Sequence, residues 1–107
     1  WKQNDELSMR LAMTMIDDFV AQKAKREIRP AIYELAVAME EKLRKNEHKG
    51  GWADCPWSYL QHRLNEELKE LDHAIAFGTP LETLLEAADV ANFLMMIVDK
   101  KKGEKHE

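Results

Sequence analysis

The chain has 107 residues, of which 45% are hydrophobic and 34% charged, and its formal net charge is −4. This composition predicts one globular domain, spanning residues 1–107, whose negative charge argues against binding to duplex nucleic acid. The longest uninterrupted apolar stretch, Phe93 to Val98, is too short to cross a membrane, and the single cysteine, Cys55, excludes an internal disulfide and favours a reducing, cytoplasmic location.

The first half of the chain predicts two helices. Asn4 or Asp5 can cap a first helix that runs to about Lys25. Pro30 suits the first turn of a second helix that runs to about Asn46. Their expected inner faces, read from spacings of three and four residues, are Leu7, Leu11, Met15, Phe19 and Val20 in the first helix and Ile32, Leu35, Met39 and Leu43 in the second.

The second half predicts two more helices after a segment, 47–56, that contains glycines and a proline. They cover about residues 57–78 and 79–101, and so short a link makes them antiparallel neighbours. Period-two alternation is absent from the sequence, so we expect an all-α fold of about four helices. Because two helix hairpins bury only part of this apolar content, self-association should complete the bundle. The side chains of the third helix that should face inward are Leu60, Leu64, Leu68, Leu71 and Ile75.

Two acidic clusters lie inside the apolar sequence of these last helices. Glu66, Glu67 and Glu70 form the first cluster, and Glu86 and Asp89 form the second. Residues three apart project from the same side of a helix, and the two clusters lie at similar heights from the turn. We therefore expect Glu67, Glu70, Glu86 and Asp89 to face one another across the helix pair.

Converging carboxylates repel one another, and burial raises their pKa values, so such a group needs a counter-ion. Mg²⁺ or Mn²⁺ would supply it, because hard cations prefer oxygen ligands and Mg²⁺ recruits substrate phosphates. One alternative is salt bridges to Arg63, to Lys69 or to a lysine of another chain. A second alternative is a di-iron site on Glu70 and His73, which would need another Glu-x-x-His pair that the fourth helix does not provide.

The arrangement of these acids resembles the signature of the MazG-like, all-α nucleoside triphosphate pyrophosphohydrolases. It reads Glu66-Glu67-x-x-Glu70, then Glu86-x-x-Asp89, followed by Val90-Ala91-Asn92-Phe93. Upstream, the segments 39–43 (Met-Glu-Glu-Lys-Leu) and 49–52 (Lys-Gly-Gly-Trp) resemble one subgroup of the family. The resemblance covers a family-like core of about residues 30–101, and the N-terminal helix, 1–26, is less diagnostic.

The resemblance implies a MazG-like bundle that hydrolyses a nucleoside or deoxynucleoside triphosphate to the monophosphate and pyrophosphate. Glu67, Glu70, Glu86 and Asp89 would be the ligands of Mg²⁺, with Mn²⁺ as a substitute, and Glu66 would orient or deprotonate the attacking water. Family members are typically dimers or tetramers, so a homodimer or homotetramer is expected. A relative acting on dUTP or phosphoribosyl-ATP is an alternative. The competing class is a non-enzymatic helical module whose acids bind a basic partner.

Five further residues are candidates for binding the nucleotide. Lys49 and Arg63 could bind the triphosphate, or they could be ordinary solvated charges. Trp52 could stack on a base, or it could fill the edge of the core. Asn92 needs a hydrogen-bond partner within apolar sequence. Lys100 could reach a phosphate, or it could complement the dipole at the end of its helix.

Overall fold

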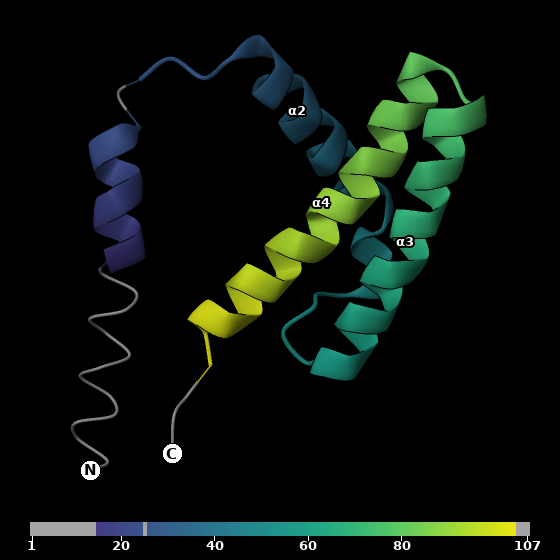
Figure 1. The fold of residues 1–107 in the computed structure, drawn as a ribbon. Helices are drawn as coiled ribbons and strands as arrows, with labels where there is room; N and C mark the ends of the chain where they lie inside the picture. The colour runs from purple at the N-terminus through teal and green to yellow at the C-terminus, as the bar shows by residue number, and fades with distance from the viewer. Residues whose placement is uncertain (1–14, 25, 105–107) are drawn as a thin grey trace.

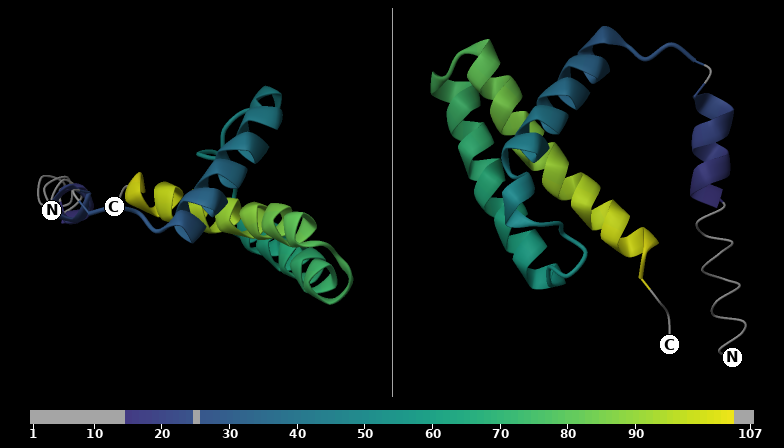
Figure 2. Two further views of the ribbon diagram at one scale, coloured as in Figure 1. Left: turned by 90° about the horizontal axis from the view of Figure 1, so that it is seen from above. Right: turned by 180° about the vertical axis from the view of Figure 1, so that it is seen from behind.

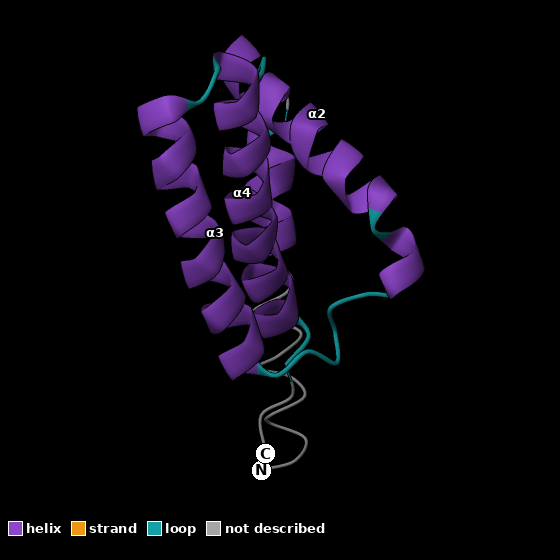
Figure 3. Cartoon of the chain, turned by 90° about the vertical axis from the view of Figure 1, so that its right-hand side faces the viewer, coloured by secondary structure: helices purple, strands orange, loops and turns teal. Residues whose placement is uncertain are grey.

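The computed structural model describes residues 15–24 and 26–104, and this part of the chain is helical with no strand (Figures 1 and 3). A helical segment covers residues 15–23. It is followed by α2 (Pro30–Lys45), the short 3₁₀ helix η1 (Glu47–Lys49), α3 (Trp57–Phe77) and α4 (Pro80–Lys102). The predicted all-α class is confirmed, and the predicted bounds of α2, α3 and α4 lie within about two residues of the observed ones.

Local chemistry explains where these helices begin and end. Pro30 and Pro80 occupy the first turns of α2 and α4, where a missing backbone N–H costs nothing. The Thr79 hydroxyl accepts a 3.1 Å hydrogen bond from the backbone N–H of Glu82 and so caps α4. At Gly78 an added Cβ would lie 2.8 Å from the Ala74 carbonyl oxygen. Glycine therefore permits the tight turn that returns the chain antiparallel to α3.

The helix α4 is the centre of the molecule, because it packs against both α3 and α2. Figures 1 and 2 show α3 and α4 as a long antiparallel hairpin, with α2 crossing α4 at an angle and projecting away from the hairpin. The predicted hairpin is confirmed. One face of the α3–α4 hairpin therefore meets α2, and the opposite face has no helix of the described chain over it.

The buried positions are few and differ from the predicted inner faces. Within residues 15–24 and 26–104, the buried apolar residues are Ala38, Leu60, Ala74, Ala88 and Val90, and two polar residues, Glu67 and Asn92, are buried with them. Leu60 was correctly predicted. Ile32 is 56% exposed, Leu68 40% and Ile75 64%, so these three predictions of inward side chains are wrong for the single chain. Leu68 and Ile75 are exposed because α2 packs on α4 and leaves their side of α3 uncovered.

The helical segment 15–23 meets the rest of the molecule at the end of α4, where Lys102 Nζ lies 3.3 Å from Asp17 Oδ1. Met15, Phe19 and Val20, predicted to face inward, are exposed here. The other two residues of that predicted stripe, Leu7 and Leu11, lie outside the described residues. Over the described ranges, no helix combines the length and apolar character needed to cross a membrane.

Candidate metal centre

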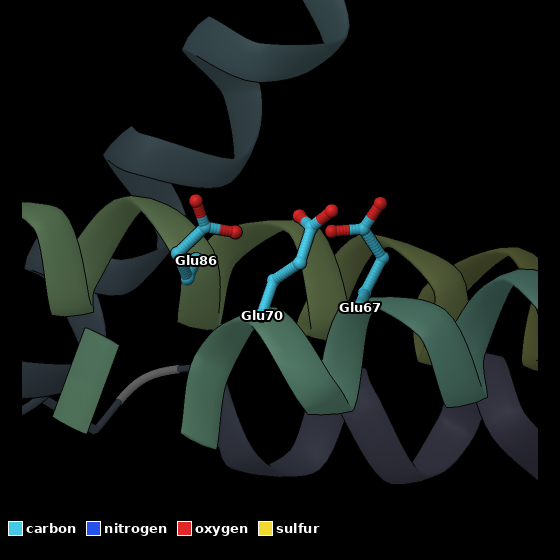
Figure 4. Close-up of side chains that lie close together, drawn as sticks. All are labelled: Glu67, Glu70 and Glu86. Carbon is cyan, nitrogen blue, oxygen red and sulfur yellow. The ribbon is translucent and has the colours of Figure 1, made fainter. Parts of the chain in front are cut away.

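Three glutamates from the two hairpin helices come together at mid-height. One carboxylate oxygen from each of Glu67, Glu70 and Glu86 lies within 4.8 Å of the others, a spacing that allows all three to bind one metal ion. Figure 4 shows the carboxylates of the two α3 residues and of Glu86 from α4 side by side, with Glu70 between the other two. The predicted convergence across the helix pair is present for these three acids, which we call the glutamate triad.

Glu67 is the most unusual member of the triad, because it is only 5% exposed. Burial, the neighbouring carboxyl of Glu70 and the charges of Glu70 and Asp89 together raise the pKa of its carboxyl to about 7, against the opposing effect of Arg63. A carboxyl that resists ionisation at neutral pH is unstable as a bare anion. Its site therefore favours either a proton or a cation.

The carboxyl of Glu86 also has a raised pKa. Burial raises the pKa of its carboxyl, and the charges of Glu70 and Asp89 act in the same direction. In the described structure, Glu67 Oε2 and Glu86 Oε2 are both buried without a hydrogen-bond partner. Unpaired buried carboxylate oxygens are costly, and hard divalent cations accept oxygen donors of this kind. The residues present therefore fit a divalent cation.

Asp89, the fourth predicted ligand, is near the triad but is bound differently. Its Oδ2 lies 3.1 Å from Lys42 Nζ in a half-buried ion pair between α4 and α2. Its charge nevertheless raises the pKa values of Glu67 and Glu86, which places it within electrostatic range of both. The structure thus gathers three of the four predicted ligands and pairs the fourth with a lysine.

Glu66, the predicted catalytic residue, lies on the outer side of the same helix. Its Oε1 lies 3.1 Å from Arg63 Nη1 and 3.4 Å from His62 Nε2. The other arm of the Arg63 guanidinium donates a 2.7 Å hydrogen bond to Glu67 Oε1. Arg63 therefore bridges the buried triad and the exposed Glu66, and this ion pairing is the salt bridge that the sequence left as an alternative.

The triad stands between two hollows. Glu67 and Asp89 line an open cavity of about 630 Å³ between α2, the 46–55 loop, α3 and α4. Glu70 and Glu86 line a smaller hollow of about 480 Å³ beside His73 and Phe77. A ligand in the larger cavity would reach the triad from the Glu67 side. We call this larger space the central cavity.

Four of the predicted substrate-binding residues line the central cavity: Lys49, Trp52, Arg63 and Asn92. The Trp52 indole is held at the rim, because its Nε1 donates a 2.9 Å hydrogen bond to Asp99 Oδ2. The guanidinium of Arg63 lies over the Phe93 ring at 5.3 Å. Asn92 is 4% exposed and donates from Nδ2 to the Met39 carbonyl oxygen at 3.1 Å. This bond fixes the amide orientation and leaves Oδ1 buried with no partner within the described chain.

Lys100 is placed elsewhere. Its Nζ donates a 3.1 Å hydrogen bond to the Ala53 carbonyl oxygen and lies 5.3 Å from the centre of the Trp57 ring. It lines a separate hollow with Lys102 and Glu104. In this structure Lys100 holds the 46–55 loop against the end of α4.

Sequence reasoning did not assign Lys42, the partner of Asp89. A signal was present, because Lys42 lies three residues after Met39 and seven after Leu35, beside the apolar stripe of α2. A charge in that position is as unexpected as the carboxylates of α3 and α4.

Searches against protein-family models, curated proteins and solved structures gave no match. The chemistry of the site therefore carries the functional interpretation.

Proposed function

We propose that the chain is a Mg²⁺-dependent nucleoside triphosphate pyrophosphohydrolase. The single observation that carries this proposal is the glutamate triad, which has two buried carboxylate oxygens without partners and borders a cavity with basic walls. The carboxylates of the triad favour a cation, and Lys49 and Arg63 in the cavity wall favour an anion. A metal ion bound to a polyphosphate would satisfy both. The motif's resemblance to the MazG-like family suggests which bond is cut, the one between the α- and β-phosphates.

The proposed reaction is attack of water on the α-phosphorus, which breaks the bond to the oxygen that bridges the α- and β-phosphates. A monophosphate and pyrophosphate result. When bound, Mg²⁺ would neutralise phosphate charge and acidify a water molecule. Glu67, Glu70 and Glu86 would hold the cation, and Asp89 would complete the set. A carboxylate would accept the proton of that water, and the resemblance assigns this role to Glu66, which Arg63 links to Glu67 in this structure.

The central cavity supplies the groups that position the nucleotide. Lys49 and Arg63 provide positive charge for the triphosphate. Trp52 at the rim offers an aromatic face for the base. The buried Oδ1 of Asn92 presents an acceptor to a ligand group that donates a hydrogen bond. Transfer between phosphorus centres asks a protein mainly for such positioning and electrostatics.

A panel of nucleotides with a pyrophosphate readout, with and without Mg²⁺, tests the proposal. The panel contains the standard and damaged nucleoside triphosphates, dUTP and phosphoribosyl-ATP, so it also tests the related substrate classes. Glu70→Gln is the informative variant, and Glu41→Gln, an exposed position on α2, is its matched control. Release of pyrophosphate only with Mg²⁺, lost in Glu70→Gln and retained in Glu41→Gln, supports the enzyme. If no member of the panel yields pyrophosphate and Mg²⁺ leaves thermal stability unchanged, the acids belong to a non-enzymatic interaction module.

We also propose that a second copy covers the reverse face of the hairpin, the side turned away from α2. Leu68 and Ile75 on α3 and Leu94 and Val98 on α4 share this face and are 40–64% exposed. Exposed apolar side chains gathered on one face are typical of a protein–protein interface, which supports a homodimer or homotetramer.

A further inference from the structure

Lys42 projects from α2 into the wall of the central cavity, between the acids and the basic residues. Its Nζ lies 3.1 Å from Asp89 Oδ2, and the two side chains are 25% and 24% exposed. Its charge also offsets part of the rise in the pKa of Glu86. Lys42 is therefore the cation of the described structure that neutralises one side of the proposed metal centre.

Asp89 lacks the buried, unpaired oxygen that Glu67 and Glu86 each have in the described chain. Its counter-ion is the Lys42 ammonium, whereas the other oxygen of Glu67 is paired with Arg63. A divalent cation that takes Asp89 as a ligand must compete with this ammonium, because both bind the same carboxylate. Binding of the cation therefore leaves Lys42 without its anion.

The released ammonium has one obvious destination. Lys42 lines the same cavity as Lys49 and Arg63, on the side where a polyphosphate would meet the triad. We propose that Lys42 is an exchange cation, which neutralises Asp89 until a divalent cation replaces it and then binds a phosphate group of the ligand. This inference rests on the proposed metal site, and it adds a residue and a role that the family resemblance did not assign.

The exchange couples two binding events. A divalent cation frees Lys42 for phosphate, and phosphate bound to Lys42 frees Asp89 for the cation, so each ligand strengthens the other. The coupling exists before any bond is cut. It can therefore be measured by binding alone, with inorganic pyrophosphate as the polyphosphate.

Titration calorimetry with Mg²⁺, and then with pyrophosphate at saturating Mg²⁺, tests the exchange in two variants. Lys42→Met removes the competing ammonium while keeping a long side chain, so Mg²⁺ should bind roughly threefold to fivefold more tightly, as expected for one partly exposed ion pair. Pyrophosphate should bind more weakly by roughly tenfold or more, the effect of one lost charged hydrogen bond. Lys42→Arg should show the opposite change for Mg²⁺, because a guanidinium holds a carboxylate with two parallel bonds.

Lys45→Met, an exposed position on the same helix, is the matched control for loss of one positive charge. If Lys42→Met and Lys45→Met change Mg²⁺ affinity equally, the effect is general charge and the exchange is wrong. If Lys42→Met leaves Mg²⁺ affinity unchanged but lowers the melting temperature, Lys42 only ties α2 to α4. The order of affinities Met, wild type, Arg supports the exchange.

The outcome is independent of hydrolysis. Mg²⁺ affinities in the predicted order, with no pyrophosphate release from any nucleotide, would support the exchange and overturn only the proposed reaction. Hydrolysis with unchanged Mg²⁺ affinity in both Lys42 variants would retain the enzyme and overturn the exchange. Absence of Mg²⁺ binding to the wild-type chain would overturn both.

Discussion

Two stripes of α3 have the same spacing and opposite surroundings. Leu60, Glu67 and Ala74, at intervals of seven residues, are buried against α4. Leu68 and Ile75, also seven residues apart, each follow one of these buried residues on an adjacent face of the helix and are 40% and 64% exposed. Glu67 is thus more deeply buried than Ile75, about two turns away.

The contrast shows that neighbours decide burial here more than hydropathy does. The side of α3 that packs on α4 includes the carboxylate of Glu67, whereas the side with Leu68 and Ile75 has no helix over it in the described chain. Each anomaly calls for something else. The buried acids need a cation, because unpaired buried charge is costly. The exposed Leu68 and Ile75 favour contact with another protein surface, because exposed apolar faces are sites of association.

The largest expected effect concerns the buried acids. Replacing Glu70 by glutamine removes one ligand and one charge from the triad, and it should lower the rate of pyrophosphate release by roughly 10³-fold, since the charge on the phosphates is then poorly neutralised. The rate should be measured over a range of Mg²⁺ concentrations. If high Mg²⁺ restores the Glu70→Gln rate fully, Glu70 contributes only to affinity. An unchanged rate at every concentration would remove Glu70 from the centre.

The fold could be predicted closely from the sequence because its signals are local. The signal at Pro30 and the short link between residues 78 and 80 act within a few residues, and the helices begin and end within about two residues of the expected positions. The inner faces were less predictable. The periodicity of α3 identifies its leucines, but which stripe is covered depends on where α2 crosses, and that is a contact between distant parts of the chain.

In the candidate site, too, the local features were predictable and the contacts between distant parts of the chain were not. Helix period and the short turn were enough to bring Glu67, Glu70 and Glu86 together. The pairing of Asp89 with Lys42 spans 47 residues of sequence and joins helices whose crossing was unknown. Lys100 was placed on the site by counting along α4, whereas the structure turns its ammonium to the loop carbonyl of Ala53.

The second prediction tests the other stripe of α3. Replacing Leu68 and Ile75 together by glutamate places like charges on both partners of the proposed interface. The dissociation constant should rise by roughly 100-fold or more, because two apolar contacts are lost and the new charges repel. Sedimentation velocity over a concentration series measures the change.

Asn65→Glu is the control for this double variant, since it adds charge at an exposed position elsewhere on α3. The helical content should be unchanged in both variants, because the substituted side chains are exposed in the single chain. If the double variant still forms the oligomer, the interface lies on another surface, such as the apolar side chains of segment 15–23.

The smallest expected effect is on the pH dependence of stability, and it tests whether Glu67 belongs to a metal site or to a structural salt bridge. Its pKa is about 7 in the folded metal-free protein and near 4.5 in the unfolded chain, so the folded state binds this proton more tightly. The stabilising effect of the proton is complete below about pH 4.5 and is lost as pH rises towards 7. Glu67→Gln cannot lose it. In the absence of metal, the variant should therefore be more stable than wild type by roughly 1–2 kcal/mol above pH 7, with the difference shrinking as pH falls and vanishing below about pH 4.5.

Denaturant unfolding of both proteins in EDTA, from about pH 4 to 8.5, measures the difference in their free energies of unfolding. The expected value is smaller than the full pKa shift implies, because glutamine also weakens the 2.7 Å bond from Arg63. Added Mg²⁺ should then stabilise the wild type and leave Glu67→Gln little changed, since only the wild type retains the complete set of carboxylates. If Glu67→Gln is instead less stable at every pH, the ion pair with Arg63 outweighs the repulsion. The buried acid would then be a structural salt bridge, and the contrast between the two stripes of α3 would need no metal ion.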